Sequence, residues 1–151
     1  MKYYIDSCIW LNLFKKEEKY CSIAEKFIQN TIKKKEKIAI SKHILTEIKF
    51  RLNGNFHKIE KYFEDNKTDI VYVKTIDEDY NNARKIESEN KYQIGFYDCL
   101  HISICKRLNL ILITRDRDLI RIGSKYIKVK KPEYLIHTFS SKIFNILYLF
   151  R

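Results

Sequence analysis

The sequence predicts an α/β fold in which helices flank a central parallel sheet of about five strands. Short apolar runs alternate along the chain with longer amphipathic segments, the order expected of a parallel sheet covered on both faces. The chain has 151 residues, 45% of them hydrophobic, which is enough for one domain with one core. Its 3 glycines and 1 proline argue against an all-β design rich in tight turns. We therefore expect residues 1–151 to form a single domain.

The expected strands are short apolar runs, of which "LILIT" is as apolar as any in the chain. In chain order they cover residues 3–5, 38–40, 70–73, 110–114 and 126–129. Apolar residues at helical spacing predict helices between them, over residues 8–14, 21–37, 42–52, 56–63, 76–86, 98–108 and 118–122.

Several helix starts carry capping signals. Ser7 and Ser41 each precede an apolar helical stretch and can cap it. Thr75, with Glu78 three residues later, has the form of a capping box. The tail 140–151 contains the apolar run "IFNILYLF" and has no assigned place in this scheme. We expect it to dock on the core as a final helix or strand, or to form a dimer contact.

The charge balance is strongly basic. Lys and Arg total 30 against 19 acidic residues, which gives a net charge of +11. Such a surface favours a polyanionic partner, and nucleic acid is the usual one. A solvated, lysine-rich surface without a nucleic-acid partner is the other interpretation of the charge alone.

Cysteine usage and hydropathy indicate the compartment in which the protein is expected to function. The cysteines form no C-x-x-C pair, so we expect reduced core residues rather than zinc ligands or disulfides at the positions Cys8, Cys21, Cys99 and Cys105. No apolar run reaches the ~18 residues of a membrane span. The N-terminal "MKYYIDSCIW" contains Asp6 within its apolar stretch and lacks a small-residue cleavage site, unlike a signal peptide. We therefore expect a cytoplasmic protein with no membrane partner.

Acidic residues occur where the predicted strands end. Asp6 directly follows the first strand, and Asp116 follows the fourth by two residues. Asp98 lies in the first turn of the helix that leads into the fourth strand, and Glu47 lies on the border of the apolar stripe of the helix after the second strand. Since the carboxyl ends of parallel strands share one edge of a sheet, we expect these acids to converge there. Each of them, and Asp118, could instead be a cap, turn or border residue.

Carboxylates brought together in this way repel one another unless a cation or a proton is present. Several carboxylates without a competing thiolate or histidine pair indicate a site for a hard cation, Mg²⁺ or Mn²⁺. Such cations are commonly used on phosphate esters, where they neutralise charge and activate water. An acidic metal pocket inside a basic protein suits a nucleic-acid substrate.

Three stretches resemble the PIN-domain ribonucleases, the family that includes the toxins of VapBC toxin–antitoxin pairs. They are "YYIDSCIWLNLF", "ILTEI" and "YDCLHISICKRLNLILITRDRDLI", and the resemblance extends over about residues 2–130. The last stretch is the most specific, because an Asp, a helix, an apolar strand ending in Thr and a further acid follow one another in the order typical of the family.

The resemblance implies the metal-binding acids Asp6, Glu47, Asp98 and Asp116. It implies that Ser7 and Thr114 support them through hydroxyl hydrogen bonds. Asp118 is a possible alternative to Asp116 as the fourth acid. We favour Asp116 because it leaves the strand first, with Asp118 better placed to cap the short helix that follows.

Other polar and aromatic residues near these motifs are weaker candidates. His101, one turn after Asp98, is expected to pack beside the site rather than to bind metal. Arg115 and Arg117 flank the fourth acid and are candidates for phosphate contacts. Phe96 and Tyr97 could stack on RNA bases, although packing in the core or at its rim is the simpler expectation. The remaining histidines are expected at the surface: His43, His57 and His137.

The resulting hypothesis is a Mg²⁺- or Mn²⁺-dependent endoribonuclease that cleaves single-stranded RNA with metal-activated water and leaves a 5′-phosphate. By resemblance it is the toxin of a VapBC-type pair, with a small antitoxin partner and a homodimeric state. The alternatives are an RNA-processing PIN nuclease without an antitoxin and a non-catalytic RNA-binding module. A phosphatase-like hydrolase on a similar sheet is disfavoured because "YYIDSCIWL" lacks a D-x-D pair.

Overall fold

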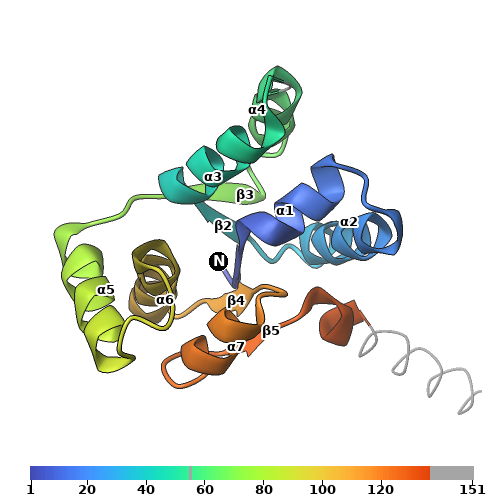
Figure 1. Ribbon diagram of the computed structural model, residues 1–151. Coiled ribbons are helices and arrows are strands. Elements are labelled where there is room, and N and C mark those ends of the chain that lie inside the picture. Colours follow the sequence, from blue (N-terminus) through green and yellow to red (C-terminus); the bar gives the residue numbers. More distant parts are fainter. Residues whose placement is uncertain (55, 137–151) are drawn as a thin grey trace, which may run out of the picture.

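A computed structural model describes residues 1–54 and 56–136, within which five parallel strands form one sheet in the order β3-β2-β1-β4-β5 (Figure 1). The strands are β1 (Tyr3–Ile5), β2 (Ile38–Ser41), β3 (Ile70–Val73), β4 (Ile111–Ile113) and β5 (Val129–Lys130). All neighbouring strands pair in parallel. The α/β class and the parallel sheet predicted from the sequence are therefore confirmed.

The helices cover both faces of this sheet. They are α1 (Ser7–Phe14), α2 (Glu18–Lys33), α3 (Lys42–Leu52), α4 (Phe56–Asp65), α5 (Asp77–Glu89), α6 (Phe96–Leu108) and α7 (Arg117–Gly123). In Figure 1, α1 and α2 lie together on one side of the sheet and α5 and α6 on the other. None of the helices in the described ranges is long and apolar enough to cross a membrane.

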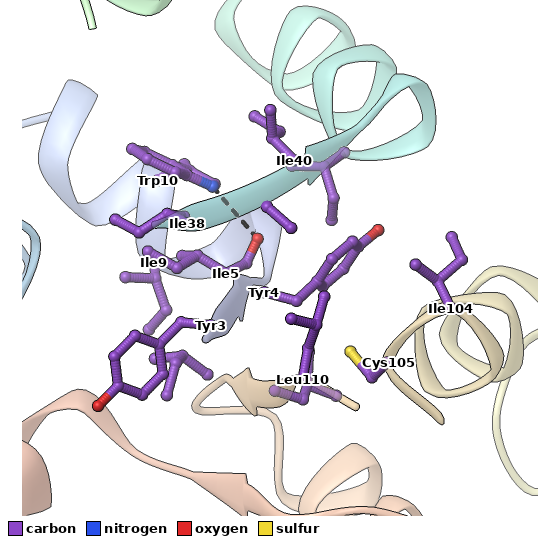
Figure 2. Packing of buried hydrophobic residues seen from close by; sticks show 14 of the residues in the cluster. Tyr3, Tyr4, Ile5, Ile9, Trp10, Ile38, Ile40, Ile104, Cys105 and Leu110 are labelled. Carbon is purple, nitrogen blue, oxygen red and sulfur yellow. Dashed lines mark hydrogen bonds between the residues drawn. The ribbon is translucent and has the colours of Figure 1, made fainter. Parts of the chain in front are cut away.

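Side chains of β1 alternate between these two layers, as the pleat of a strand requires. The Tyr3 ring packs edge-on against Phe27 of α2, with 5.1 Å between the ring centroids. Tyr4 points to the opposite face, toward α6, and Figure 2 shows the two tyrosines directed apart. Both are buried, so β1 is apolar on both faces and forms the centre of the core.

Trp10 anchors α1 to the sheet. Its side chain is fully buried, and its indole N–H donates to the carbonyl of Ile5 at 3.2 Å (Figure 2). On its other side the ring meets Phe63 of α4 edge-on, with centroids 5.0 Å apart. Because this contact holds α1 directly after β1, it also fixes the turn between them, which contains Asp6.

Strand order places the predicted acids at the centre of one edge. β1 lies between β2 and β4. The connection from β1 leads to β2 and that from β4 leads to β5, in opposite directions, so the topological switch point of this open parallel sheet lies between β1 and β4. The carboxyl ends of these three strands are therefore neighbours.

Two predicted helix caps are shifted by one residue. Asp6, not Ser7, caps α1, because its backbone is extended and its side chain accepts from the Ser7 N–H. Before α5, Ile76 occupies the cap position and its N–H donates to the Asp79 carboxylate at 3.0 Å, so the predicted Thr75–Glu78 box is wrong. Asp79 occupies this position because its buried carboxylate also binds Arg107, as described below.

The remaining sequence predictions are partly met. Ser41 caps α3 as predicted, its hydroxyl accepting from the Ile44 N–H. The fifth strand is shorter than the predicted 126–129 and covers Val129 and Lys130. The tail 140–151 and His137 lie outside the described residues.

The cysteines are all free, in line with the predicted reduced state. Cys99 and Cys105 are buried in the core, whereas Cys8 and Cys21 are only partly buried. Cys8 packs against the core cluster, so the expectation of a core position is wrong only for Cys21, whose thiol donates to the Leu13 carbonyl in a partly buried position.

A buried ion pair joins α5 to α6. The carboxylate of Asp79 is fully buried and accepts from Arg107 Nε and a terminal guanidinium nitrogen, each at 2.8 Å. Arg107 also donates to the Lys74 carbonyl at 2.9 Å. The pair fixes the position of the helix that carries Asp98.

Arg107→Ala leaves the Asp79 carboxylate buried without its cation, so we expect a loss of about 3 kcal/mol in the free energy of unfolding. Lys67→Ala removes the exposed Lys67–Glu64 pair and serves as the control, with an expected loss much smaller than that of Arg107→Ala because solvent screens the exposed pair. Urea titration of both variants measures the two losses. Equal losses would show that the buried pair contributes no more than a surface pair.

Candidate metal centre

The predicted acids converge at one pocket of about 560 Å³ on the carboxyl edge of the sheet. It is lined by side chains of α1, α3 and α6 and of the segments that follow β1 and β4, including all the predicted acids: Asp6, Glu47, Asp98 and Asp116. The structure thus brings together residues up to 110 positions apart in the sequence, Asp6 and Asp116.

Asp6 is the most tightly held of these carboxylates. Its Oδ1 accepts from the Ser7 N–H at 2.8 Å, and its Oδ2 accepts from the Thr114 hydroxyl at 2.7 Å and the Cys8 thiol at 3.2 Å. The side chain is buried. It is therefore an oriented carboxylate at the carboxyl end of β1, and none of its hydrogen-bond partners in the described part of the chain is a cation.

Thr114 connects two of the acids. Its hydroxyl donates to Asp6 and accepts from the Asp116 N–H at 3.1 Å. This is the supporting role that the family resemblance implied for Thr114. Ser7, implied for the same role, lines the pocket and donates to Asp6 through its backbone.

The structure separates the two acids of "RDRD". Asp116 lines the pocket and caps α7, its Oδ1 accepting from the Leu119 N–H at 2.9 Å. Asp118 is exposed and pairs with Arg121 at 3.2 Å, one turn along the helix. The prediction that Asp118 is the capping residue is therefore wrong: the acid nearest the strand end fills the cap and still reaches the pocket.

Glu47 is held by a chain of buried hydrogen bonds. His101 Nε2 lies 3.1 Å from Glu47 Oε1, and its Nδ1 lies 2.8 Å from the Tyr4 hydroxyl. That hydroxyl lies 2.6 Å from the Ser41 hydroxyl. Because a carboxylate only accepts, Nε2 is the donor to Glu47. The chain runs from the core of the sheet to the pocket and fixes the position of Glu47.

Charge complementarity accompanies this contact. Burial lowers the pKa of His101, but the hydrogen bond to Glu47 and the negative charges of Glu47, Asp6 and Asp98 outweigh it, so the pKa of His101 is raised. The imidazolium form is thus stabilised beside the acids.

The pKa of Glu47 is lowered. Burial raises it, but the hydrogen bond and charge of His101 act more strongly in the other direction, aided by the Ser7 hydroxyl and the Arg51 charge. Glu47 is therefore ionised at neutral pH and accepts a hydrogen bond from His101 Nε2.

The pKa of Asp98 responds to burial and to the negative charges around it. Burial, followed by the charges of Asp6, Asp116 and Glu47, raises its pKa from 3.8 to about 6 against the opposing effect of His101. A carboxyl group in this state gains from a proton or from a divalent cation.

The donor set fits Mg²⁺ or Mn²⁺. Carboxylate oxygens are the ligands that these hard cations prefer. Ligand atoms of Asp6, Glu47 and His101 lie within 4.8 Å of one another. Both ring nitrogens of His101 are already hydrogen-bonded, so the carboxylates are the available ligands and His101 orients one of them.

A family model for the PIN domain matches residues 3–125. The chain belongs to the PIN domain family. PIN domains are nuclease domains, and the acidic pocket lies within the matched range. A search of curated proteins gives no match.

Solved structures share the fold of this PIN domain. A toxin–antitoxin complex from Klebsiella pneumoniae has a TM-score of 0.64 at 19% identity, covering 87% of this chain and 98% of that chain. VapBC-1 from nontypeable Haemophilus influenzae has a TM-score of 0.65 at 16% identity, covering 88% of this chain and 99% of that chain. VapBC2 from Rickettsia felis, bound to a DNA fragment from its promoter, has a TM-score of 0.63 at 18% identity, covering 87% of this chain and 98% of that chain. At these identities the likeness shows the fold.

The PIN domain pocket also has a rim that the sequence analysis missed. His43, Phe50 and Arg51 all line it from α3, and Phe50 is 83% exposed. Positions 43, 47 and 51 are spaced at i, i+4 and i+8, so helical spacing from Glu47 could have identified two of them. His43 was expected at the surface. It is half-buried, lies 3.1 Å from the Tyr80 hydroxyl and has a lowered pKa, chiefly because of burial.

The aromatic candidates separate into one rim residue and one packed residue. Tyr97 is 54% exposed, lines the pocket and contacts the His43 ring, with centroids 5.4 Å apart. Phe96 packs instead against Tyr80 and lies under the Arg84 guanidinium, 3.9 Å from its ring centroid.

The two arginines predicted to contact phosphate lie in different environments. Arg115 pairs with Glu133, donates to Asn12 at 3.1 Å and stacks on Tyr20, so its charge is already neutralised away from the pocket. Arg117 is exposed and lines a neighbouring hollow. The short-range sequence signal could not distinguish them, because Glu133 and Tyr20 come from distant parts of the chain.

Cys8 lies in the pocket beside Asp6. Burial, followed by the Asp6 charge, raises the pKa of its thiol to about 12. It therefore remains protonated at neutral pH and donates to Asp6 rather than acting as a nucleophile.

Asp98 predicts a pH-dependent stability of the metal-free chain. Its folded pKa of about 6 exceeds the ordinary 3.8, so the folded state binds more protons between these values and stability falls as pH rises through that window. Above about pH 6 the folded state bears the whole destabilisation caused by ionised Asp98, and below about pH 3.8 it bears none. Each unit of pKa shift corresponds to about 1.4 kcal/mol.

We therefore expect Asp98→Asn to be more stable than the wild type at pH 7.5 in EDTA, by up to about 3 kcal/mol. The difference should shrink toward zero as the pH falls from 6 to about 4. Urea unfolding of both chains over this range measures it. If the difference in the free energy of unfolding stays constant across the range, the pKa of Asp98 is not raised in the folded state.

Proposed function

We propose that this PIN domain is a divalent-metal-dependent endoribonuclease acting on single-stranded RNA. The observation that carries the proposal is the convergence of the carboxylates of Asp6, Glu47, Asp98 and Asp116 on one pocket, where burial, followed by the charges of the other three acids, raises the pKa of Asp98. A structural role would not need this unfavourable arrangement, and a cation relieves it. The presence of every expected acid also argues against a non-catalytic binding module.

These carboxylates would hold Mg²⁺ or Mn²⁺. When bound, such an ion activates water and neutralises charge on the phosphate. The chain's own residues orient the ligands: Thr114 holds Asp6, and His101 holds Glu47. Arg51, exposed at the pocket rim, places a positive charge where a phosphodiester would approach.

The rim supports RNA with unpaired bases as the substrate. Phe50 and Tyr97 are large exposed aromatic side chains that line the same pocket as the acids. Aromatic rings stack on bases that are not paired, and this stacking tolerates any base sequence. The net charge of +11 supports a polyanionic substrate in addition.

The biological setting we propose is a VapC-like toxin with a small antitoxin partner. Support comes from similar folds described as a toxin–antitoxin complex and as VapBC complexes. The homodimeric state and the cytoplasmic location stay predictions from the sequence.

The central experiment is cleavage of end-labelled single-stranded RNAs by the purified chain. We expect cutting with Mn²⁺ or Mg²⁺, none in EDTA, and a loss of at least about 100-fold in Asp98→Asn, because metal activation contributes several kcal/mol to such reactions. Asp118→Asn is the matched control, since it removes an acid from the same motif outside the pocket and should cut at the wild-type rate. Equal activity of the wild type and Asp98→Asn would contradict the proposal.

Phe50→Ala tests the rim. The side chain is 83% exposed, so its loss should leave folding unchanged. We expect KM for single-stranded RNA to rise about fivefold or more, the effect of losing one stacked base, with kcat little changed. Tyr72→Ala, which removes an exposed ring from β3 outside the acidic pocket, should leave KM unaltered. An unchanged KM in Phe50→Ala would remove the stacking role.

A further inference from the structure

A basic hollow of about 370 Å³ lies next to the acidic pocket. Its lining contains the cations Arg117, Lys130 and Lys131, one exposed ring, Tyr134, and two apolar side chains, Ile120 and Val129. No acidic residue lines it. None of the cations has an ion pair among the described residues.

The hollow and the acids share one edge of the sheet. Arg117 directly follows Asp116, the acid at the end of β4. Lys130 is the register partner of Ile113 at the end of that strand, and its carbonyl accepts from the Thr114 N–H at 3.1 Å. Since β5 is the strand beyond β4, the hollow lies on the β5 side of the acids.

Charge in this hollow is unbalanced. Glu133, the nearest acid in sequence to Lys131 and Tyr134, is paired with Arg115 and leaves the cations of the hollow unneutralised. Three cations around one small space repel one another and favour an anion there.

Tyr134 indicates which anion. Tyr134 is 60% exposed and lines the hollow together with the apolar side chains of Ile120 and Val129. Cations that track phosphates, combined with a ring and an apolar floor for a base, form the usual binding surface for single-stranded nucleic acid. A free phosphate ion would use the cations but would gain nothing from the ring.

We propose that this hollow binds a nucleotide of the substrate RNA adjacent to the one cut at the acidic pocket, with its phosphate on Lys130, Lys131 and Arg117 and its base on Tyr134. The assignment rests on the proposed function for the identity of the strand. A strand across both sites has its reacting phosphate at the acids and its neighbouring phosphate at the cations.

The test is binding of a fluorescein-labelled single-stranded RNA of about 12 nucleotides in EDTA, followed by anisotropy over a salt series. In EDTA no metal chemistry takes place, so the readout does not depend on cleavage. We expect Lys130→Gln/Lys131→Gln to weaken binding about tenfold near 0.1 M salt and to lower the slope of log Kd against log salt by about 1.4.

The matched control lies at the opposite edge of the sheet. A hollow of about 640 Å³ there is also lined by lysines, including Lys106 and Lys128. Lys106→Gln/Lys128→Gln changes the net charge by the same amount, so general electrostatic attraction would weaken binding equally in both pairs. We expect less than a twofold change in this control. Equal weakening of the two pairs would overturn the proposal.

Tyr134 supplies a second, independent variant. Tyr134→Ala should weaken binding about fivefold or more, whereas Tyr134→Phe keeps the ring and should bind as the wild type does. Failure of Tyr134→Ala to weaken binding would overturn the base contact. Binding of inorganic phosphate is measured for the lysine pair as well. If Lys130→Gln/Lys131→Gln weakens phosphate binding but leaves the affinity for RNA unchanged, the nucleotide assignment is overturned.

The outcomes also separate this proposal from the nuclease proposal. If the chain binds RNA through the hollow but Asp98→Asn cuts as the wild type does, the metal-centre proposal is contradicted and the hollow proposal is supported. If cutting depends on metal and on Asp98 but substitution of the lysine pair leaves RNA binding unaltered, the hollow proposal is contradicted and the nuclease proposal is supported.

Discussion

The candidate site depends on one buried hydrogen-bond chain, from Ser41 through Tyr4 and His101 to Glu47. It starts at the carboxyl end of β2, passes through the buried Tyr4 and His101, and ends on a carboxylate at the pocket. Unpaired polar groups at this depth would each be costly, so the members of the chain stabilise one another only when all are present. The chain therefore couples the packing of β1, β2 and α6 to the position of one acid.

Around this chain the fold concentrates negative charge that it does not itself neutralise. Thr114 orients Asp6, and the segment after β4 supplies Asp116, while His101 forms a hydrogen bond to Glu47 alone among the acids. Burial, followed by the charges of the neighbouring acids, raises the pKa of Asp98. Functional sites are where proteins keep such unfavourable groupings, because a ligand later compensates them. The basic surface outside the pocket has the opposite sign, which suits a polyanion that must bring its phosphates to the acids.

Sequence reasoning identified the sheet and the converging acids because both follow from simple rules. Apolar runs mark parallel strands, and acids such as Asp6 and Asp116 directly after them must meet at one edge. It failed where distant residues compete for a local role. Asp79 displaced the predicted Thr75 cap because it also pairs with Arg107, and Arg115 is withdrawn from the site by Glu133. Phe50 was missed because an exposed aromatic residue on a helix carries no signal until its neighbours are known.

The central claim is that the acidic pocket binds a divalent cation, and binding of Mn²⁺ measured by calorimetry in buffers of different ionisation enthalpy tests it most directly. Because Asp98 has a pKa of about 6, saturable binding at pH 6 should release roughly half a proton, and binding at pH 7.5 almost none. Asp6→Asn should weaken binding at both pH values. Absence of saturable binding to the folded wild-type chain, or equal binding by the wild type and Asp6→Asn, would contradict the account.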